Sequence, residues 1–273
     1  MRVLIPLILS LCFATVGNGS QGPDASAERL RSMRELAAGV AMETASGSVH
    51  RNLKRLDEPV YRFDDPARRT FDGTMWVWCD SGRPSATMTV TKHASPKGGH
   101  HWLTELTSLA PGPLSATIER IGGWQPSQPG APMQKFSKAP VPAKDAASRL
   151  RQMKDLARQI RAHEKTLPRD QSAVERYELR VLPQPVHRYA DAKSGLIDGA
   201  MFIIAYGRNP EIVMLVEAHS EGSSEPAWHC GFARVAAWNT HVEFDGKEIW
   251  SGGGYPKGPD DTYWLFTRPV LDE

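Results

Sequence analysis

The chain has 273 residues, and its 33 Lys and Arg residues nearly balance its 31 Asp and Glu residues, which gives a formal net charge of +2 at pH 7. Nucleic acid is therefore not expected as a partner, because phosphate binding usually requires a concentrated basic face. The length suits two domains, and 8 Trp, 6 Tyr and 8 Phe supply enough large apolar side chains for two cores.

Residues 1–19 are predicted to be a signal peptide. Arg2 is followed by an apolar run over residues 3–13 and then by small residues. The run is too short to cross a bilayer, which needs about 20 apolar residues. Cleavage near Gly19 is favoured over a lipoprotein signal at Cys12, because Leu11 is bulkier than the residue that usually precedes such a cysteine. No later segment is apolar enough to span a membrane, so the mature chain is expected to be exported, to the periplasm or the extracellular space.

A long internal repeat organises the remaining chain. Residues 53–124 match residues 179–250 without a gap when each residue is compared with the one 126 positions later. The identical pairs include Leu56 and Leu182, Pro59 and Pro185, Arg62 and Arg188, Asp72 and Asp198, Gly73 and Gly199, Met75 and Met201, His93 and His219, Trp102 and Trp228, and Trp124 and Trp250. Solenoid modules repeat every 20 to 50 residues or so, so this unit is the size of a domain.

Each copy is predicted to begin with a helix. Apolar residues recur at three-and-four spacing over residues 30–40, and the pattern returns 120 positions later over residues 150–160. Asp145 or Ser148 is a candidate cap for the second helix. The basic outer faces of both helices are interpreted as solvated surfaces.

An antiparallel sheet is predicted after each helix. In the second copy the expected strands cover residues 177–182, 186–189, 201–206, 212–216, 228–236 and 240–244. Two of these runs, 201–206 and 212–216, are continuously apolar, which is typical of strands at the buried centre of a sheet. A faint similarity between residues 136–141 and 266–270 suggests that each copy closes with one more strand.

The predicted fold class is α+β, with two tandem homologous repeats, each an N-terminal helix followed by an antiparallel sheet of five or six strands. The expected boundaries are residues 27–141 for repeat domain 1, 142–148 for a linker and 149–271 for repeat domain 2. The element order resembles cystatin-like and nuclear-transport-factor-like folds. Such folds serve binders, inhibitors and enzymes alike, so this likeness does not identify a function.

The second copy also contains a longer pattern of residues that covers several of the predicted strands and their connections. Its residues are Leu182, Pro183, Gln184, Pro185, Arg188, Tyr189, Asp198, Gly199, Ala200, Met201, Phe202, Pro210, Glu211, Leu215, Val216, Glu217 and Ala218. This pattern resembles a family of uncharacterised exported bacterial proteins. The first copy departs from it at Ser85, which takes the place of Glu211. The resemblance implies export and a repeated domain, and brings no established activity with it.

Polar residues that occur in both copies are candidates for a binding site. They are Arg62, Asp72 and His93 in the first copy and Arg188, Asp198 and His219 in the second. A site of this kind would be one pocket in each copy or a joint site between them. A structural role is favoured, because an aspartate before a glycine commonly holds a turn and an arginine can pair with a nearby carboxylate.

Two tryptophans are candidates for a surface site. Trp238 and Trp264 have no aromatic counterpart in the first copy, whereas Trp124 and Trp250 form a repeated pair that suits a core. Exposed tryptophans can stack on sugar rings or anchor a protein interface. The expected partner is therefore an unknown protein or a carbohydrate.

Little in the sequence indicates a metal, a cofactor or a catalytic residue. His93, His100 and His101 lie close together, but no carboxylate or cysteine falls at a recognised zinc spacing. The chain also lacks a nucleophile elbow, a P-loop and a Ser-x-x-Lys motif. Cys79 and Cys230 do not occupy equivalent positions, and two buried thiols are favoured over a disulfide between the copies.

The sequence as a whole predicts an exported, non-enzymatic binding or structural protein of unknown ligand. The alternative is an unrecognised hydrolase or a metal-binding protein with its site at the repeated Asp and His positions. This alternative stays open because paired catalytic carboxylates meet in space and need no fixed spacing in the sequence.

Overall fold

The computed structural model describes residues 23–46, 49–68, 70–95, 98–166, 174–220 and 225–270. The predicted signal peptide lies outside these residues. The described chain consists of two α-helices, two short 3-10 helices and antiparallel strands, so the predicted α+β class is confirmed. Neither described α-helix is long and apolar enough to cross a membrane.

We call residues 23–145 the first half and residues 146–270 the second half. The first half contains α1 (Pro23–Ala38), β1 (Val40–Ser46), β2 (Val49–Asn52), β3 (Lys54–Arg55), β4 (Tyr61–Asp65), η1 (Pro66–Arg68), β5 (Thr70–Asp80), β6 (Arg83–Ala94), β7 (His100–Ser108), β8 (Leu114–Ile118), β9 (Gly122–Trp124) and β10 (Gln134–Lys135). The second half contains α2 (Ala146–Arg158), β11 (Arg161–Thr166), β12 (Glu175–Val181), β13 (His187–Asp191), η2 (Ala192–Ser194), β14 (Leu196–Tyr206), β15 (Asn209–His219), β16 (Ala227–Arg234), β17 (Asn239–Phe244), β18 (Lys247–Gly252) and β19 (Tyr263–Pro269).

The ends of the helices follow local chemistry. Asp145 caps α2, because its side chain accepts a hydrogen bond from the backbone N–H of Ser148 at 2.8 Å. Both helices stop before the end of the predicted apolar pattern, since Val40 already belongs to β1 and Ile160 precedes β11. The segments expected to be plain connections after each helix are therefore strands, which the sequence did not predict.

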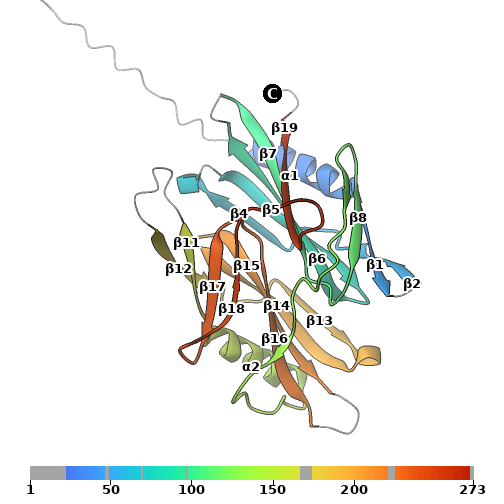
Figure 1. The fold of residues 1–273 in the computed structure, drawn as a ribbon, viewed down its shortest axis with the longest axis vertical. Helices are drawn as coiled ribbons and strands as arrows, with labels where there is room; N and C mark the ends of the chain where they lie inside the picture. The colour runs from blue at the N-terminus through green and yellow to red at the C-terminus, as the bar shows by residue number, and fades with distance from the viewer. Residues whose placement is uncertain are drawn as a thin grey trace, which may run out of the picture.

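Three antiparallel sheets carry these strands. One has the order β19-β7-β6-β5-β3, with β4 also paired to β5, and a second has the order β10-β16-β15-β14-β12-β11-β17-β18, with β13 paired to β14. The third is β2-β1-β8-β9. Figure 1 shows α1 in the upper part of the molecule and α2 in the lower part, on either side of the sheets.

The pairings of β4 with β5 and of β13 with β14 share one register once 126 is added to each residue number. Phe63 lies opposite Gly73, and Tyr189 lies opposite Gly199. A Cβ atom at Gly73 would come within 2.7 Å of the Phe63 ring, and one at Gly199 within 2.5 Å of the Tyr189 ring. Both glycines are therefore needed to let an aromatic ring lie across the neighbouring strand.

Three hydrophobic cores are stacked through the molecule. One lies between α2 and its sheet, a second between α1 and its sheets, and a central core lies between the two halves. In β14, Phe202 and Ile204 belong to the α2 core while Met201 and Ile203 belong to the central core. Because β14 and β15 are buried on both faces, their sequences are continuously apolar, as the sequence predicted for central strands.

The two halves exchange a strand. Strand β10, at the end of the first half, pairs with β16 of the second half, and β19, at the end of the second half, pairs with β7 of the first. In Figure 1, β19 accordingly lies beside β7 although the two are far apart in the sequence. The expectation that each copy closes its own sheet with this strand was wrong, since each strand closes the sheet of the other half.

The register of the exchanged strands shows which of their residues correspond. Arg268 of β19 lies opposite Trp102, and the backbone N–H of Phe136 donates to the carbonyl oxygen of Trp228 at 2.9 Å, which continues the register of β10. Trp228 is the repeat counterpart of Trp102. Phe136 therefore corresponds to Arg268, two positions away from Phe266, with which the sequence similarity had matched it.

The packing of Phe136 predicts that the second half depends on the segment that it receives from the first. Phe136 is 3% exposed, belongs to the α2 core and lies against the ring of Phe244. We expect Phe136→Ala to lower the free energy of unfolding by about 3 kcal/mol, because the substitution leaves a cavity in that core. Urea denaturation checks this value.

Val141→Ala is the matched control, since Val141 lies in the same segment but is 50% exposed. A loss of stability no larger for Phe136→Ala than for Val141→Ala would contradict the role given to the exchanged segment.

Candidate functional site

The repeated Arg and Asp residues of the first half bind one another. Arg62 on β4 donates two hydrogen bonds to Asp72 on β5, of 2.9 and 2.5 Å, and Arg29 of α1 donates a third at 2.9 Å. Arg62 also donates to the carbonyl oxygen of Ser26, in the first turns of α1, at 2.9 Å. The hydrogen bond to Asp72 raises the pKa of Arg62. This cluster fastens the beginning of α1 to the sheet.

The second half has the same arrangement. Arg188 donates to Asp198 at 2.9 and 2.6 Å, Arg149 of α2 donates at 2.8 Å, and Arg188 reaches the carbonyl oxygen of Ala146 at 2.6 Å. In both halves the carboxylate is almost fully buried and both of its oxygens accept from guanidinium groups. These carboxylates are therefore already neutralised by the fold.

The repeated histidines do not join these clusters. Lys92 lies opposite Asp72, so His93, the next residue, points to the other face of the sheet. His93 stacks on His101 with ring centres 5.8 Å apart, and burial together with the neighbouring His101 lowers the pKa of His93 to about 4. His219 instead contacts Glu217 at 2.8 Å. The structure thus keeps the repeated histidines and aspartates apart.

The two candidate tryptophans have different surroundings. Trp238, in the turn between β16 and β17, is 40% exposed. Trp264, on β19, is only partly exposed, packs against the α1 core and lies 5.0 Å from Phe266 between ring centres. Trp238 alone of the two is a freely accessible surface aromatic.

The cysteines and histidines show no metal or redox site among the described residues. Cys79 and Cys230 are both buried free thiols. Burial raises the pKa of Cys79 to about 11 and that of Cys230 to about 12, so neither is a thiolate at neutral pH. Within the described ranges, no three His, Cys, Asp or Glu side chains are grouped so that they could hold a metal ion.

A buried group of charges joins the two halves. Arg68 of the first half donates to Glu164 and Glu211 of the second, and both carboxylate side chains are fully buried. The Arg68 guanidinium also lies 4.5 Å from the centre of the Tyr206 ring, and Asn209 donates to Glu211 at 2.8 Å. Burial raises the pKa of Glu164 and, more strongly, that of Glu211, while Arg68 acts in the opposite direction.

One further ion pair crosses between the sheets, and two tyrosines donate hydrogen bonds to glutamates within a sheet. Arg83 of the first half approaches Glu217 of the second at 2.9 Å, and the Tyr189 hydroxyl donates to the same carboxylate at 2.8 Å. Tyr263 of β19 donates to the buried Glu105 of β7 at 2.5 Å. The Arg83–Glu217 pair therefore joins the two halves, and the Tyr263–Glu105 hydrogen bond fastens β19 to β7.

Sequence reasoning missed these charges because it looked for residues shared by both copies. Arg68 corresponds to Ser194, Glu211 to Ser85 and Glu164 to Thr44. The replacement of Glu211 by Ser85 in the first copy was visible in the sequence. It was the signal that Glu211 makes a contact, here with Arg68, that has no equivalent in the first copy.

A groove of about 660 Å³ lies in the first half. It runs between α1 and the ends of β6, β7 and β19, next to the turn between β8 and β9. Ser32 and Leu36 line its α1 side, and Ile121 and Val270 line the other side. Its size is that of a typical small-molecule site, about 300 to 1,000 Å³.

A row of four residues crosses the floor of this groove and the strands beside it. Asp72, Lys92, Trp102 and Arg268 lie directly opposite one another on β5, β6, β7 and β19. Opposed residues of neighbouring strands point to the same face, which here is the face that α1 covers. Lys92 is 3% exposed and Trp102 is 6% exposed. Two cations therefore flank a tryptophan at the base of the groove.

Beyond Asp198, the corresponding row in the second half is buried and apolar. Asp198, Ala218 and Trp228 lie opposite one another, and Phe136 follows in the place of Arg268. Ala218 replaces Lys92. Phe136 is buried here and packs on Phe244, with ring centres 5.3 Å apart. The position that is open in the first half is thus filled in the second.

The segment after β10 fills the rest of this position. Gln152, the counterpart of the groove residue Ser32, donates to the carbonyl oxygen of Val141 at 2.9 Å and accepts from the backbone N–H of Ala143 at 2.8 Å. Asp245, the counterpart of the groove residue Glu119, binds Lys138 at 2.7 Å. The chain between β10 and α2 therefore lies where the first half has its groove.

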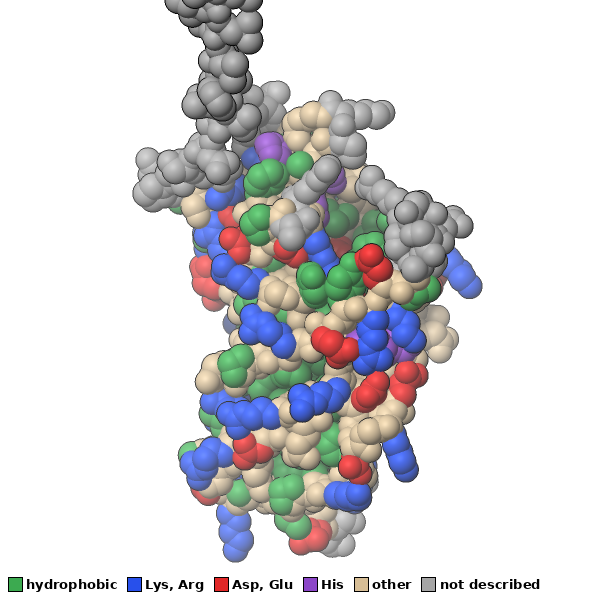
Figure 2. Space-filling view, turned by 90° about the vertical axis from the view of Figure 1, so that its left-hand side faces the viewer, with side chains coloured by type: hydrophobic (Ala, Val, Ile, Leu, Met, Phe, Trp, Pro, Cys, Tyr) green, Lys and Arg blue, Asp and Glu red, His purple; other side chains and the backbone are tan. Residues whose placement is uncertain are grey.

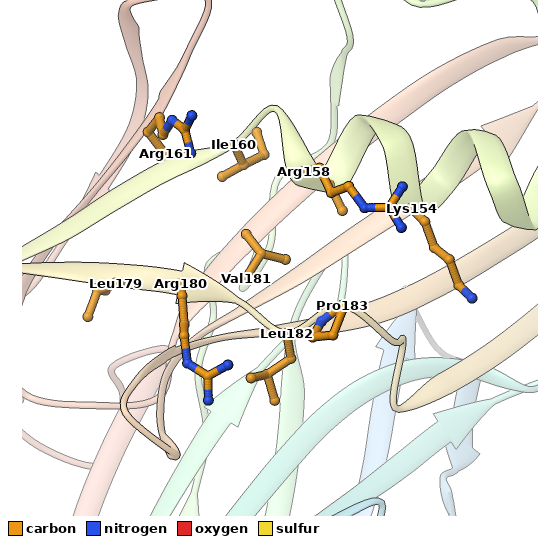
Figure 3. Close-up of a pocket in the computed structure, with 10 residues that line it drawn as sticks. Lys154, Arg158, Ile160, Arg161, Leu179, Arg180, Val181, Leu182 and Pro183 are labelled. Atoms are coloured by element: carbon orange, nitrogen blue, oxygen red, sulfur yellow. The ribbon is translucent and has the colours of Figure 1, made fainter.

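A smaller cleft in the second half is more basic but less suited to a ligand. It measures about 240 Å³, lies between α2 and β12, and includes Lys154, Arg158 and Arg180. Figure 2 shows Lys and Arg side chains around hydrophobic ones over the lower part of the molecule, to which α2 and β12 belong. In Figure 3 the cations point in different directions, and Arg180 points away from α2. Arg158 pairs with Asp155, and Arg180 donates to the carbonyl oxygen of Gly207, so these groups have their own partners.

Comparisons with models of protein families, with curated proteins and with solved structures found no match for this chain. What the protein does must therefore be inferred from its own geometry.

The Arg68 contacts predict a strong and pH-dependent effect of removing this residue. We expect Arg68→Met to lower the free energy of unfolding by roughly 3 to 5 kcal/mol at pH 7.5, because it leaves two buried carboxyl groups without their cation. Burial raises the pKa of both groups above the usual 4.5, so the folded protein favours their protonated forms. Ionisation of these groups therefore lowers the stability of the fold as the pH rises, and protonation restores it as the pH falls. The deficit should therefore be smaller at pH 5, as measured by urea denaturation at both pH values.

Arg158→Met provides the control, because Arg158 is well exposed and pairs with Asp155 on the surface. An Arg68→Met deficit that is equal at the two pH values, or no larger than that of Arg158→Met, would mean that the buried carboxylates do not depend on Arg68.

Proposed function

We propose that this protein is an exported, non-enzymatic binding protein that holds a small ligand in the groove between α1 and the strands β6, β7 and β19. One observation carries this proposal. The same position in the second half is occupied by Phe136 and the segment that follows it, so this plan of helix and sheet leaves a space that the molecule itself fills in one half and leaves open in the other.

The walls of the groove are held by strong contacts. Arg29 and Arg62 fasten α1 to β5 through Asp72, and β19 is fixed to β7 along seven opposed residue pairs. A site on fixed elements binds without first paying the entropy of ordering its walls. The alternative of a hydrolase or metal site at the repeated Asp and His positions gains no support from their contacts, because arginines hold the aspartates and the histidines lie elsewhere.

We also propose that the two halves are copies of one unit, with repeat domains over residues 27–141 and 149–271 and a linker over 142–148. The shared registers of β4, β5 and β6 with β13, β14 and β15 support this relation. An experimental structure in which the halves do not superpose at the 126-residue offset would contradict it. Under this proposal, one copy has kept an open groove and the other serves as its support.

Export is proposed from the first 19 residues, in which Arg2, an apolar run and small residues follow one another. We expect the chain, expressed in full in a bacterial host, to be found outside the cytoplasm with its first residue near residue 20. Mass spectrometry of the purified protein measures this directly. A chain that keeps residues 1–19 and stays in the cytoplasm would contradict export.

Filling the groove should remove ligand binding. We expect the mature protein to bind the neutral fluorescent probe N-phenyl-1-naphthylamine, and Ser32→Phe to weaken this binding by about tenfold, which corresponds to 1.4 kcal/mol. Ser32 lines the groove from α1 and has Gln152, which holds the linker, as its counterpart. Fluorescence titration gives the dissociation constants.

Ala27→Phe is the matched control, because Ala27 lies on the same helix, is exposed and does not line the groove. The probe should bind this variant as it binds the unchanged protein. Equal binding to the Ser32→Phe variant, confirmed as folded by circular dichroism, would place the probe elsewhere and contradict the proposed site.

A further inference from the structure

We infer that the ligand of the first-half groove is a small amphipathic anion, with one anionic head such as a carboxylate beside Arg268 and Lys92 and an apolar body along Trp102 and the α1 side. This inference rests on the proposed function of the groove. It names the chemical class of the ligand, which that function leaves open.

The first support is the difference between the halves at two positions of one row. Lys92 and Arg268 line the groove, whereas their counterparts Ala218 and Phe136 are apolar and buried. Either position can be apolar in this fold, since the second half makes both so. Placing the Arg268 guanidinium at the base of the open groove costs desolvation energy, and a bound anion would offset that cost.

The second support is the environment of Arg268. Its Nε and Nη2 atoms are buried and have no hydrogen-bond partner in the part of the chain that the structure describes. The guanidinium contacts the ring of Phe266, 5.2 Å from its centre, but a ring does not replace a hydrogen-bond acceptor. Leaving a buried donor unsatisfied is unfavourable, and more so when the group is charged. A carboxylate is the acceptor whose planar geometry matches a guanidinium best.

The third support is the rest of the lining, which limits the anion to one head group. Trp102 lies between the two cations, and Leu36, Ile121 and Val270 add apolar surface. Glu28, Glu35 and Glu119 also line the groove and would repel a second negative charge, and Glu119 lies near enough to act on the Arg268 guanidinium. The groove therefore favours one anionic group at its base and an uncharged, apolar remainder.

Competition between three ligands of the same chain length tests this inference. N-phenyl-1-naphthylamine bound to the mature protein is displaced by decanoate, by 1-decanol or by decyltrimethylammonium, and fluorescence gives each inhibition constant. We expect decanoate to bind at least about tenfold more tightly than the other two, because its carboxylate can accept hydrogen bonds from the buried Nε and Nη2 atoms of Arg268. In Arg268→Met this preference should fall to about twofold or less, while the probe itself still binds. Lys92→Met serves as a second variant, and Arg161→Met, at an exposed position far from this groove, should keep the full preference.

The outcomes separate the two proposals. If the probe binds and Ser32→Phe weakens it, but decanol competes as well as decanoate, the groove is a binding site and the inference of an anion is wrong. If Arg268→Met and Lys92→Met both leave the preference for decanoate unchanged, the inference is also wrong. If the unchanged protein binds none of these compounds and a variant that ends at Val270 binds the probe, the chain's own last residues occupy the groove, which overturns the inference of a separate ligand. If Ser32→Phe has no effect on the probe, the proposed function itself fails.

Discussion

The covalent connection from β10 to α2 makes the two halves unequal. After β10 has joined the sheet of the second half, the chain must cross that half to reach the start of α2, and it does so through Phe136 and the contacts of Gln152 with Val141 and Ala143. The first half receives β19 in the same way, and within residues 23–270 no such connection crosses it. The halves share strand registers but differ at the position that this connection fills in the second half. The groove lies at the equivalent position of the first half.

The contact between the halves combines a large apolar core with a few buried charges. Met75 and Val77 from β5 face Met201 and Ile203 from β14, and burial of such side chains supplies the attraction. Apolar surfaces alone slide easily, because the hydrophobic effect has no direction. Arg68, held between Glu164 and Glu211, needs its partners in defined positions. We interpret this cluster as the feature that sets the alignment of the sheets, at some cost in desolvation.

Much of the fold followed from local patterns. The continuously apolar runs of β14 and β15 indicated central strands, and Asp145 was a correct candidate cap. Strand β11 was missed because its buried positions include His163 and Glu164, which do not look like core residues in a sequence. Strand β1 was missed because Val40 continues the helical spacing of α1. The exchange of β10 and β19 could not be seen at all, since a short strand's pattern does not say which distant strand it joins.

The candidate site shows a different limit of sequence reasoning. Residues that occur in both copies, such as Arg62 with Asp72 and Arg188 with Asp198, fasten each helix to its sheet. Lys92 and Arg268 line the groove because they differ from their counterparts, and the counterpart of Arg268 became known only from the register of β10 and β19. If the halves are copies of one unit, as proposed, their shared residues indicate common structure, and charges found in one half alone mark either the contact between the halves, as at Arg68, or the proposed groove, as at Arg268.

A crystal structure of the mature protein grown with decanoate would test the central claim most directly. The account predicts ordered density in the first-half groove, with the carboxylate in hydrogen-bond contact with Arg268, and Phe136 still in place in the second half. Density for the chain's own last residues in that groove, or decanoate bound only in the cleft beside Arg158 and Arg180, would contradict it.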